Sequence, residues 1–125
     1  MLKKVPLVGF LIVFSTVVSA QVRVDCKITS SDESSLKQFF PQPSSLDIQS
    51  IDISNGFRFS AILNQNASKF KTYVYYDSKN RYVLISKQEF QPDKNQCGKI
   101  LSTGETYSPR LENHLTYECI YICNQ

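Results

Sequence analysis

The sequence predicts a single α+β domain in which one short helix lies against an antiparallel β-sheet. Three observations favour this fold class. Several segments alternate apolar and polar residues, as strands with one buried face do. One segment near the N-terminus has apolar residues at helical spacing. Four cysteines in a chain of 125 residues indicate disulfide bonds that hold a small core together.

The first twenty residues have the three parts of a secretory signal peptide. Lys3 and Lys4 precede an apolar run over 5–18, and Ser19 and Ala20 precede the expected cleavage site. An uncleaved anchor is less favoured, because the run is interrupted and shorter than the roughly 20 apolar residues that span a membrane. Cleavage leaves 21–125 as one secreted domain without a membrane segment. Its twelve basic and eleven acidic side chains argue against a dedicated nucleic-acid binder.

A helix is predicted to begin after the first strand. Ser30 and Glu33 have the spacing of a capping box at a helix N-terminus. Three apolar side chains follow at helical spacing and are expected to face the core: Leu36, Phe39 and Phe40. Pro41 and Pro43 end the helix.

Two hairpins form the centre of the predicted sheet. Asn55-Gly56 joins 46–53, where one slip of phase predicts a bulge or a short break, to 57–63. A polar turn over 77–80 joins two runs of β-forming residues. The other predicted strands cover 22–28, 70–76, 81–86 and 115–123, whereas 102–109 contains several turn-forming residues.

The four cysteines allow three disulfide connectivities. If 115–123 is a strand, Cys119 and Cys123 are about 13 Å apart, which exceeds the reach of a disulfide. Each would then bridge to Cys26 or Cys97. A turned or helical ending would instead allow Cys119–Cys123 and leave Cys26–Cys97. A zinc site is less favoured because export oxidises thiols, and we expect no metal or cofactor.

Few residues have the pattern of a reactive site, and we predict no catalytic residue. The one histidine, His114, lies in a polar turn.

Asn66-Ala67-Ser68 is a sequon that predicts N-glycosylation of Asn66. A candidate binding surface combines stacking and phosphate-binding side chains: Lys69, Lys71, Tyr73, Tyr75, Lys79 and Arg81. Half-buried sheet aromatics beside solvated lysines are the favoured interpretation of this set, and alternation separates Tyr76 from Tyr73 and Tyr75.

Three features together resemble the RNase-like candidate secreted effectors of cereal powdery mildew fungi. They are Val24-Asp25-Cys26 soon after the signal, Cys97, and the hairpin sequence over 73–85. The resemblance covers 24–101, with Val24 in place of the family's usual tyrosine. It implies a ribonuclease-like fold, a helix on a curved antiparallel sheet, with 102–125 as a C-terminal extension. It also implies that catalysis is lost, because the family's catalytic places hold Gln42, Arg58 or Phe59, and Lys87 or Gln88.

The leading hypothesis is a secreted, non-enzymatic virulence effector of the avirulence type, delivered into the host cell, that binds a host protein. A plant immune receptor and RNA are further candidate partners. One alternative is a divergent secreted ribonuclease or toxin that uses His114 with Glu89 or Arg110. Another is a disulfide-rich extracellular binding or inhibitor module of unrelated lineage, a class that includes fungal β-sandwich effectors.

Overall fold

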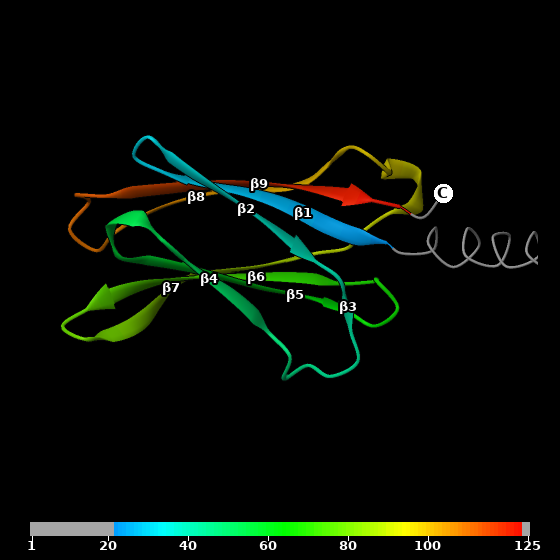
Figure 1. Ribbon diagram of the computed structural model, residues 1–125, viewed down its shortest axis with the longest axis horizontal. Helices are drawn as coiled ribbons and strands as arrows, with labels where there is room; N and C mark the ends of the chain where they lie inside the picture. Colours follow the sequence, from blue (N-terminus) through cyan, green and yellow to red (C-terminus); the bar gives the residue numbers. More distant parts are fainter. Residues whose placement is uncertain (1–21, 124–125) are drawn as a thin grey trace, which may run out of the picture.

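The chain forms two β-sheets stacked face to face in the computed structural model, which describes residues 22–123 (Figure 1). Buried and exposed residues alternate along most of the strands, as expected for sheets with one covered face. The predicted signal peptide lies outside the described residues. The strands are β1 (Arg23–Ser30), β2 (Glu33–Phe39), β3 (Pro41–Gln42), β4 (Gln49–Ile53), β5 (Phe57–Asn64), β6 (Phe70–Ser78), β7 (Arg81–Phe90), β8 (Ile100–Tyr107) and β9 (His114–Ile122). Two short 3₁₀ turns, η1 (Ser54–Gly56) and η2 (Lys94–Gln96), lie between strands.

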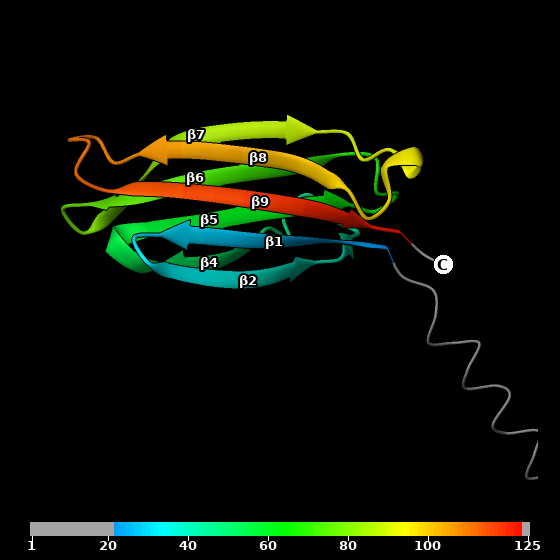
Figure 2. The same ribbon diagram turned by 90° about the horizontal axis from the view of Figure 1, so that it is seen from above.

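The two layers have different strand orders. One sheet has four antiparallel strands in the order β2-β1-β9-β8. The other has five strands, β3-β5-β6-β7 with β4 also paired to β5, and only β3 runs parallel to its neighbour. Figure 2 shows the four-stranded sheet lying over the five-stranded one. The chain changes sheet between β2 and β3 and again between β7 and β8, so the fold is a β-sandwich.

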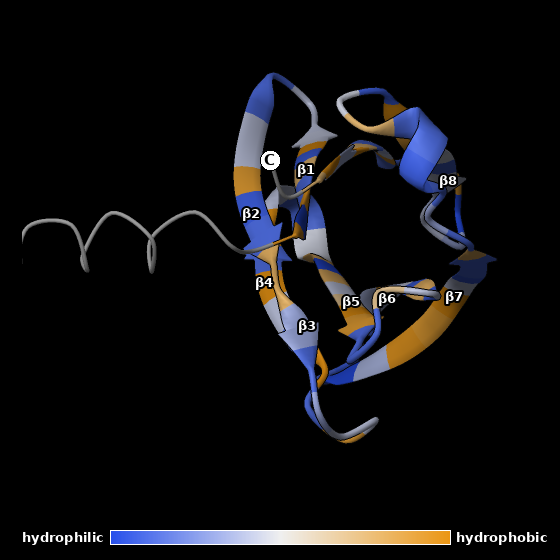
Figure 3. Ribbon diagram, turned by 90° about the vertical axis from the view of Figure 1, so that its right-hand side faces the viewer, coloured by the Kyte–Doolittle hydropathy of each residue, from blue (hydrophilic) through white to orange (hydrophobic). Residues whose placement is uncertain are grey.

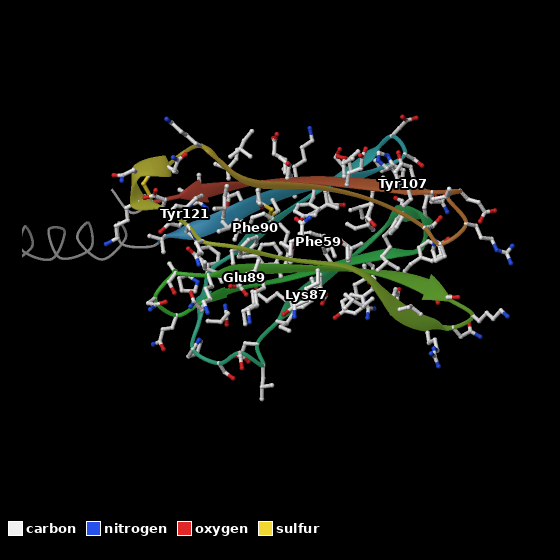
Figure 4. All side chains as sticks on the ribbon, turned by 180° about the vertical axis from the view of Figure 1, so that it is seen from behind. Phe59, Lys87, Glu89, Phe90, Tyr107 and Tyr121 are labelled. Atoms are coloured by element: carbon white, nitrogen blue, oxygen red, sulfur yellow. A yellow bond between two sulfur atoms is a disulfide. The ribbon has the colours of Figure 1, made fainter. Side chains whose placement is uncertain are left out.

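Apolar side chains from both sheets fill the space between the layers. Phe39 packs edge-on against Phe59 and Phe70, with ring centroids 6.1 and 5.7 Å apart. Figure 4 shows Phe59 between the layers, and Figure 3 shows the strands surrounding this core. The largest fully buried apolar side chains are Phe39, Phe57, Phe59, Phe70, Ile28, Leu63, Leu115, Val24 and Val74.

The prediction of a helix packed on one sheet is wrong. Ser30, the last residue of β1, pairs with Glu33, the first residue of β2, across a tight turn in which Ser31 has a φ of 58°. The buried Ser30 hydroxyl donates to the His114 carbonyl instead of capping a helix. Leu36, expected in the core, is 77% exposed on strand β2. Capping-box spacing also fits a two-residue hairpin, and here pairing with β1 decides the outcome.

The segment expected to be a C-terminal extension supplies β9 and most of β8. β9 lies between β1 and β8, so it is an interior strand of the four-stranded sheet. The turn-forming residues of 102–109 do not prevent β8, whose ladder with β9 runs from Ile100 to Tyr107 and contains a bulge after Ile100. Pairing with β9 therefore outweighs the low β-propensity of residues 102–109.

The strand ending predicted for the last cysteines is confirmed, together with the long-range bridges that it requires. Cys26 pairs with Cys119 directly across β1 and β9, with Cα atoms 4.1 Å apart. Cys97 bridges to Cys123 and attaches the β7–β8 connection to the end of β9. The first bridge is buried in the core, whereas Cys97 and Cys123 are half-buried.

Tyr117 of β9 spans the core and carries its polar end to the five-stranded sheet. Its hydroxyl lies 2.8 Å from Thr72 Oγ1 and donates to Gln88 Oε1 at 2.8 Å. The ring is 4% exposed, and burial raises the pKa of this phenol above its ordinary value of 10.0, partly offset by the Thr72 hydrogen bond.

We therefore expect the free energy of unfolding to fall in alkaline solution. The folded pKa of Tyr117 is raised, so its contribution is complete below the unfolded pKa of 10.0 and is lost as pH rises through the folded pKa. Chemical unfolding of the wild type and of Tyr117→Phe between neutral pH and a pH of about 11 measures this effect. Tyr117→Phe should show the smaller alkaline loss. Equal losses in both proteins would contradict the assignment.

Candidate functional site

The outer face of the five-stranded sheet carries aromatic and basic side chains on three adjacent strands. Phe57 and Phe59 of β5 point into the core, so Arg58 between them points outward. The register then places Tyr75 beside Arg58, and Leu84 beside Tyr75. We call this surface the tyrosine face, and its members are Arg58, Lys71, Tyr73, Tyr75, Tyr82, Leu84 and Lys87.

Arg58 connects three strands at the centre of this face. Its Nε donates to Asp52 Oδ1 of β4 at 2.7 Å. Its guanidinium carbon lies 3.9 Å from the ring centroid of Tyr82 on β7, which is cation–π distance. The Arg58 hydrogen bond lowers the pKa of Asp52, and the same contact raises the pKa of Arg58. The ion pair with Asp52 and the contact with the Tyr82 ring together orient the guanidinium group of Arg58 on this face.

The strands and turns around the tyrosine face carry an excess of positive charge. Residues 49–90 contain six basic and three acidic side chains, whereas residues 21–125 as a whole contain twelve and eleven. Lys87 Nζ lies 6.0 Å from the ring centroid of Tyr73, and Lys71 lies opposite Glu89. Within residues 22–123 no carboxylate comes within ion-pairing distance of Lys71 or Lys87.

The structure brings together part of the predicted binding surface. Lys71, Tyr73 and Tyr75 share the tyrosine face, while Tyr76 points inward and packs on Phe57 at 5.2 Å, as alternation predicted. The other predicted members lie at the two ends of β6, outside the tyrosine face: Lys69 precedes the strand, Lys79 is in the β6–β7 turn, and Arg81 is the first residue of β7.

Four members of the tyrosine face were not predicted from the sequence: Arg58, Tyr82, Leu84 and Lys87. A β-bulge in β7 shifts the pairing between Val74 and Tyr75, so the alternation that holds at Lys87 changes phase before Leu84. Simple counting from Lys87 would place Leu84 on the inner face. The signal that could have identified Arg58 was its position between two buried phenylalanines.

His114 lies on the other sheet, away from the tyrosine face. Its Nε2 is 2.7 Å from Glu105 Oε2, and its ring packs on Tyr107 with centroids 4.5 Å apart. Both contacts come from β8 and are exposed to solvent. The partners predicted from the sequence lie elsewhere: Glu89 is on β7 of the opposite layer (Figure 4). Arg110 is in the β8–β9 loop.

The positions that the resemblance assigns to lost catalytic residues point in different directions. Phe59 is buried in the core, and Gln88 accepts a hydrogen bond from Tyr117. Arg58 and Lys87 lie on the tyrosine face, whereas Gln42 on β3 lines a cavity that Lys69 and Lys71 also line.

Asn66 lies on the exposed β5–β6 loop, where the Ser68 hydroxyl donates to Asn66 Oδ1 at 2.7 Å. Glycosylation of this residue stays a prediction.

Across residues 22–123 no group of three His, Cys, Asp or Glu side chains is arranged to hold a metal ion. No helix in the same range is long and apolar enough to cross a membrane.

Comparison with known proteins adds no relative. No family model, no curated protein and no solved structure matches this chain.

Proposed function

We propose that the mature domain is an exported, non-enzymatic binding module that recognises an acidic surface of a host protein through the tyrosine face. The observation that carries the proposal is the arrangement of Arg58 between Asp52 and the ring of Tyr82, with Tyr75 and Leu84 in adjacent register. Export rests on the predicted signal peptide and agrees with two disulfide bonds.

The composition of the tyrosine face supports a protein partner. Tyrosine and arginine are the residue types enriched at the energetic centres of protein interfaces. Tyr82 and Leu84 are 38% and 46% exposed, so they offer apolar area to a partner. The excess of basic side chains over residues 49–90 favours acidic groups on the opposing surface.

RNA is the less favoured partner. Affinity for nucleic acid comes largely from cations that neutralise phosphates. On this face Arg58 is already paired with Asp52. Two further carboxylates, those of Glu89 and Asp77, lie near the remaining basic side chains. A single-stranded RNA would therefore meet mixed charge along the sheet. RNA binding is retained as an outcome of the test below.

The ribonuclease-like scaffold that the resemblance implied is wrong, because the molecule is a β-sandwich and not a helix packed on one sheet. The effector role, with a plant immune receptor among its partners, remains a prediction. A β-sandwich with two disulfides agrees with the sequence-based alternative of a disulfide-rich binding module of unrelated lineage.

Matched double variants on opposite faces test the proposal. Tyr82→Ala with Leu84→Ala removes one exposed tyrosine and one exposed leucine from the tyrosine face. Tyr107→Ala with Leu36→Ala removes the same pair of residue types from the outer face of the other sheet, where they are 49% and 77% exposed. Because all four side chains are exposed and each tyrosine makes one surface ring contact, both variants should stay folded and lose about 1 kcal/mol of unfolding free energy or less.

The binding readout compares proteins retained from host plant extract by the immobilised wild type and both variants, followed by titration of the purified partner. We expect the tyrosine-face variant to bind at least about thirtyfold more weakly, the loss typical of an interface hot spot, and the control to bind normally. Equal binding by all three proteins would refute the proposal. A labelled single-stranded RNA that binds the wild type and fails to bind only the tyrosine-face variant would favour RNA instead.

A further inference from the structure

A cavity of about 490 Å³ opens beside one end of the tyrosine face. It exists because the chain arches over β5 after it leaves β3. Ile62 points outward from β5, yet it is only 7% exposed, so it forms an apolar floor. The rest of the lining comes from the end of β3 with the β3–β4 loop, from the end of β5 with the β5–β6 loop, and from the start of β6, and it includes Gln42, Pro43, Asn64, Asn66, Lys69 and Lys71.

The lining is rich in hydrogen-bond donors and lacks negative charge. None of its residues is acidic, and two are lysines. Over residues 22–123, neither lysine has a carboxylate within ion-pairing distance. Asn66 uses its carbonyl oxygen to accept from Ser68, which leaves its Nδ2 group as a donor toward solvent. Ligands with several acceptor oxygens and negative charge match such a lining.

Asn64 fixes the loop that carries these donors. Its Oδ1 accepts from the backbone nitrogens of Ser68 and Lys69 at 2.8 and 3.0 Å. Its Nδ2 donates to Ser68 Oγ at 2.9 Å. The side chain of Asn64 is therefore engaged by its own loop, and it acts as a positioning residue that holds Lys69 at the rim. A loop fixed in this way loses little conformational entropy on binding a ligand.

We propose that this cavity binds the phosphate or sulfate ester of a small polyhydroxylated molecule. The ammonium groups of Lys69 and Lys71 bind the ester oxygens as charge-assisted donors. Amide and hydroxyl groups of the two loops bind the ligand's hydroxyl groups, and its carbon skeleton lies on Ile62 and Pro43. The proposal does not rest on the proposed function, because only Lys71 belongs to both the cavity and the tyrosine face, and the cavity needs no protein partner.

Calorimetric titration with three small probes tests the site: glucose 6-phosphate, glucose 6-sulfate and glucose. The protein is produced without glycosylation, because Asn66 lines the cavity. We expect saturable binding of at least one ester and none of glucose. The two esters distinguish a phosphorylated metabolite from a sulfated glycan as the source of the ligand.

Two matched double variants separate a built site from general charge attraction. Lys69→Gln with Lys71→Gln should weaken binding of the ester at least about tenfold. Lys94→Gln with Lys99→Gln makes the same charge change on exposed residues of the β7–β8 connection and should leave affinity unchanged. The Tyr82→Ala with Leu84→Ala variant should also bind the ester normally, so failure of one proposal is distinguishable from failure of the other.

Three results would overturn the proposal. They are the absence of saturable binding by both esters, equal binding of glucose, and equal weakening by the two lysine variants. Thermal unfolding of each variant shows that it is folded. Lys69→Gln alone provides a second folded variant, since this residue is exposed.

Discussion

Replacing Cys26 and Cys119 together with alanine is expected to lower the free energy of unfolding by about 5 kcal/mol. Their bridge closes a loop of sequence separation 93, so its removal restores a large conformational entropy to the unfolded chain. Both side chains are fully buried, and their loss also removes packing between β1 and β9. A domain of this size has about 5–15 kcal/mol in total, so the variant should be close to unfolding.

The second bridge provides the control. Cys97 and Cys123 have a sequence separation of 26 and are half-buried, so their double alanine variant should lose less, about 3.5 kcal/mol. Guanidinium unfolding followed by tyrosine fluorescence measures both, because the chain contains seven tyrosines and no tryptophan. A larger loss from the Cys97 and Cys123 variant would contradict the placement of the first bridge in the core.

Gly104→Ala is expected to destabilise the domain by about 3 kcal/mol through overpacking. A Cβ at this position would lie 2.2 Å from the Tyr117 ring, which crosses over the glycine from the adjacent strand. Tyr117 cannot easily move away, because its ring packs on Phe59 and its hydroxyl bonds to Thr72 and Gln88. The glycine is therefore required for space, not for backbone conformation.

A double-mutant cycle tests this explanation. In a Tyr117→Leu background the smaller side chain leaves room for a Cβ, so Gly104→Ala should cost at least about 1 kcal/mol less than in the wild type. Chemical unfolding of the four proteins gives the coupling energy. Additive effects would mean that the Tyr117 ring does not explain the need for glycine at this position.

The sequence predicted most strands and the long-range character of the two disulfides, because those depend on local signals. Asn55 and Gly56 have φ values of 68° and 87°, as the Asn-Gly hairpin signal requires. The strand over 115–123 excluded a Cys119–Cys123 bridge by distance and left two long-range pairings open. The register of β1 against β9, which places Cys26 opposite Cys119, decides between them.

The arrangement of the strands in two sheets could not be predicted from local sequence signals. Leu36, Phe39 and Phe40 fit helical spacing. In strand β2, however, residues three apart point to opposite faces, so Leu36 is exposed and Phe39 is buried. Nothing local indicates that this strand pairs with β1 and then crosses to the other sheet. β8 was missed for a related reason, since Gly104 reads as a turn signal until Tyr117 is placed beside it.

The candidate site was predicted in part. Strand alternation placed Lys71, Tyr73 and Tyr75 on one face. Their neighbours from β5 and β7 depend on strand order and on the bulge in β7, which are tertiary features. The cavity likewise requires the β3–β4 loop to lie over Ile62, a contact between segments that a linear pattern does not connect.

Site-specific photocrosslinking tests most directly whether the molecule binds its partner through one outer surface. A photoreactive phenylalanine derivative replaces Tyr82 in one protein and Tyr107 in another; both tyrosines are exposed, on opposite sheets. On irradiation with the purified partner, the derivative at position 82 should form the covalent adduct, and the one at position 107 should not. Adducts from position 107 alone, or from both positions equally, would contradict recognition by the tyrosine face.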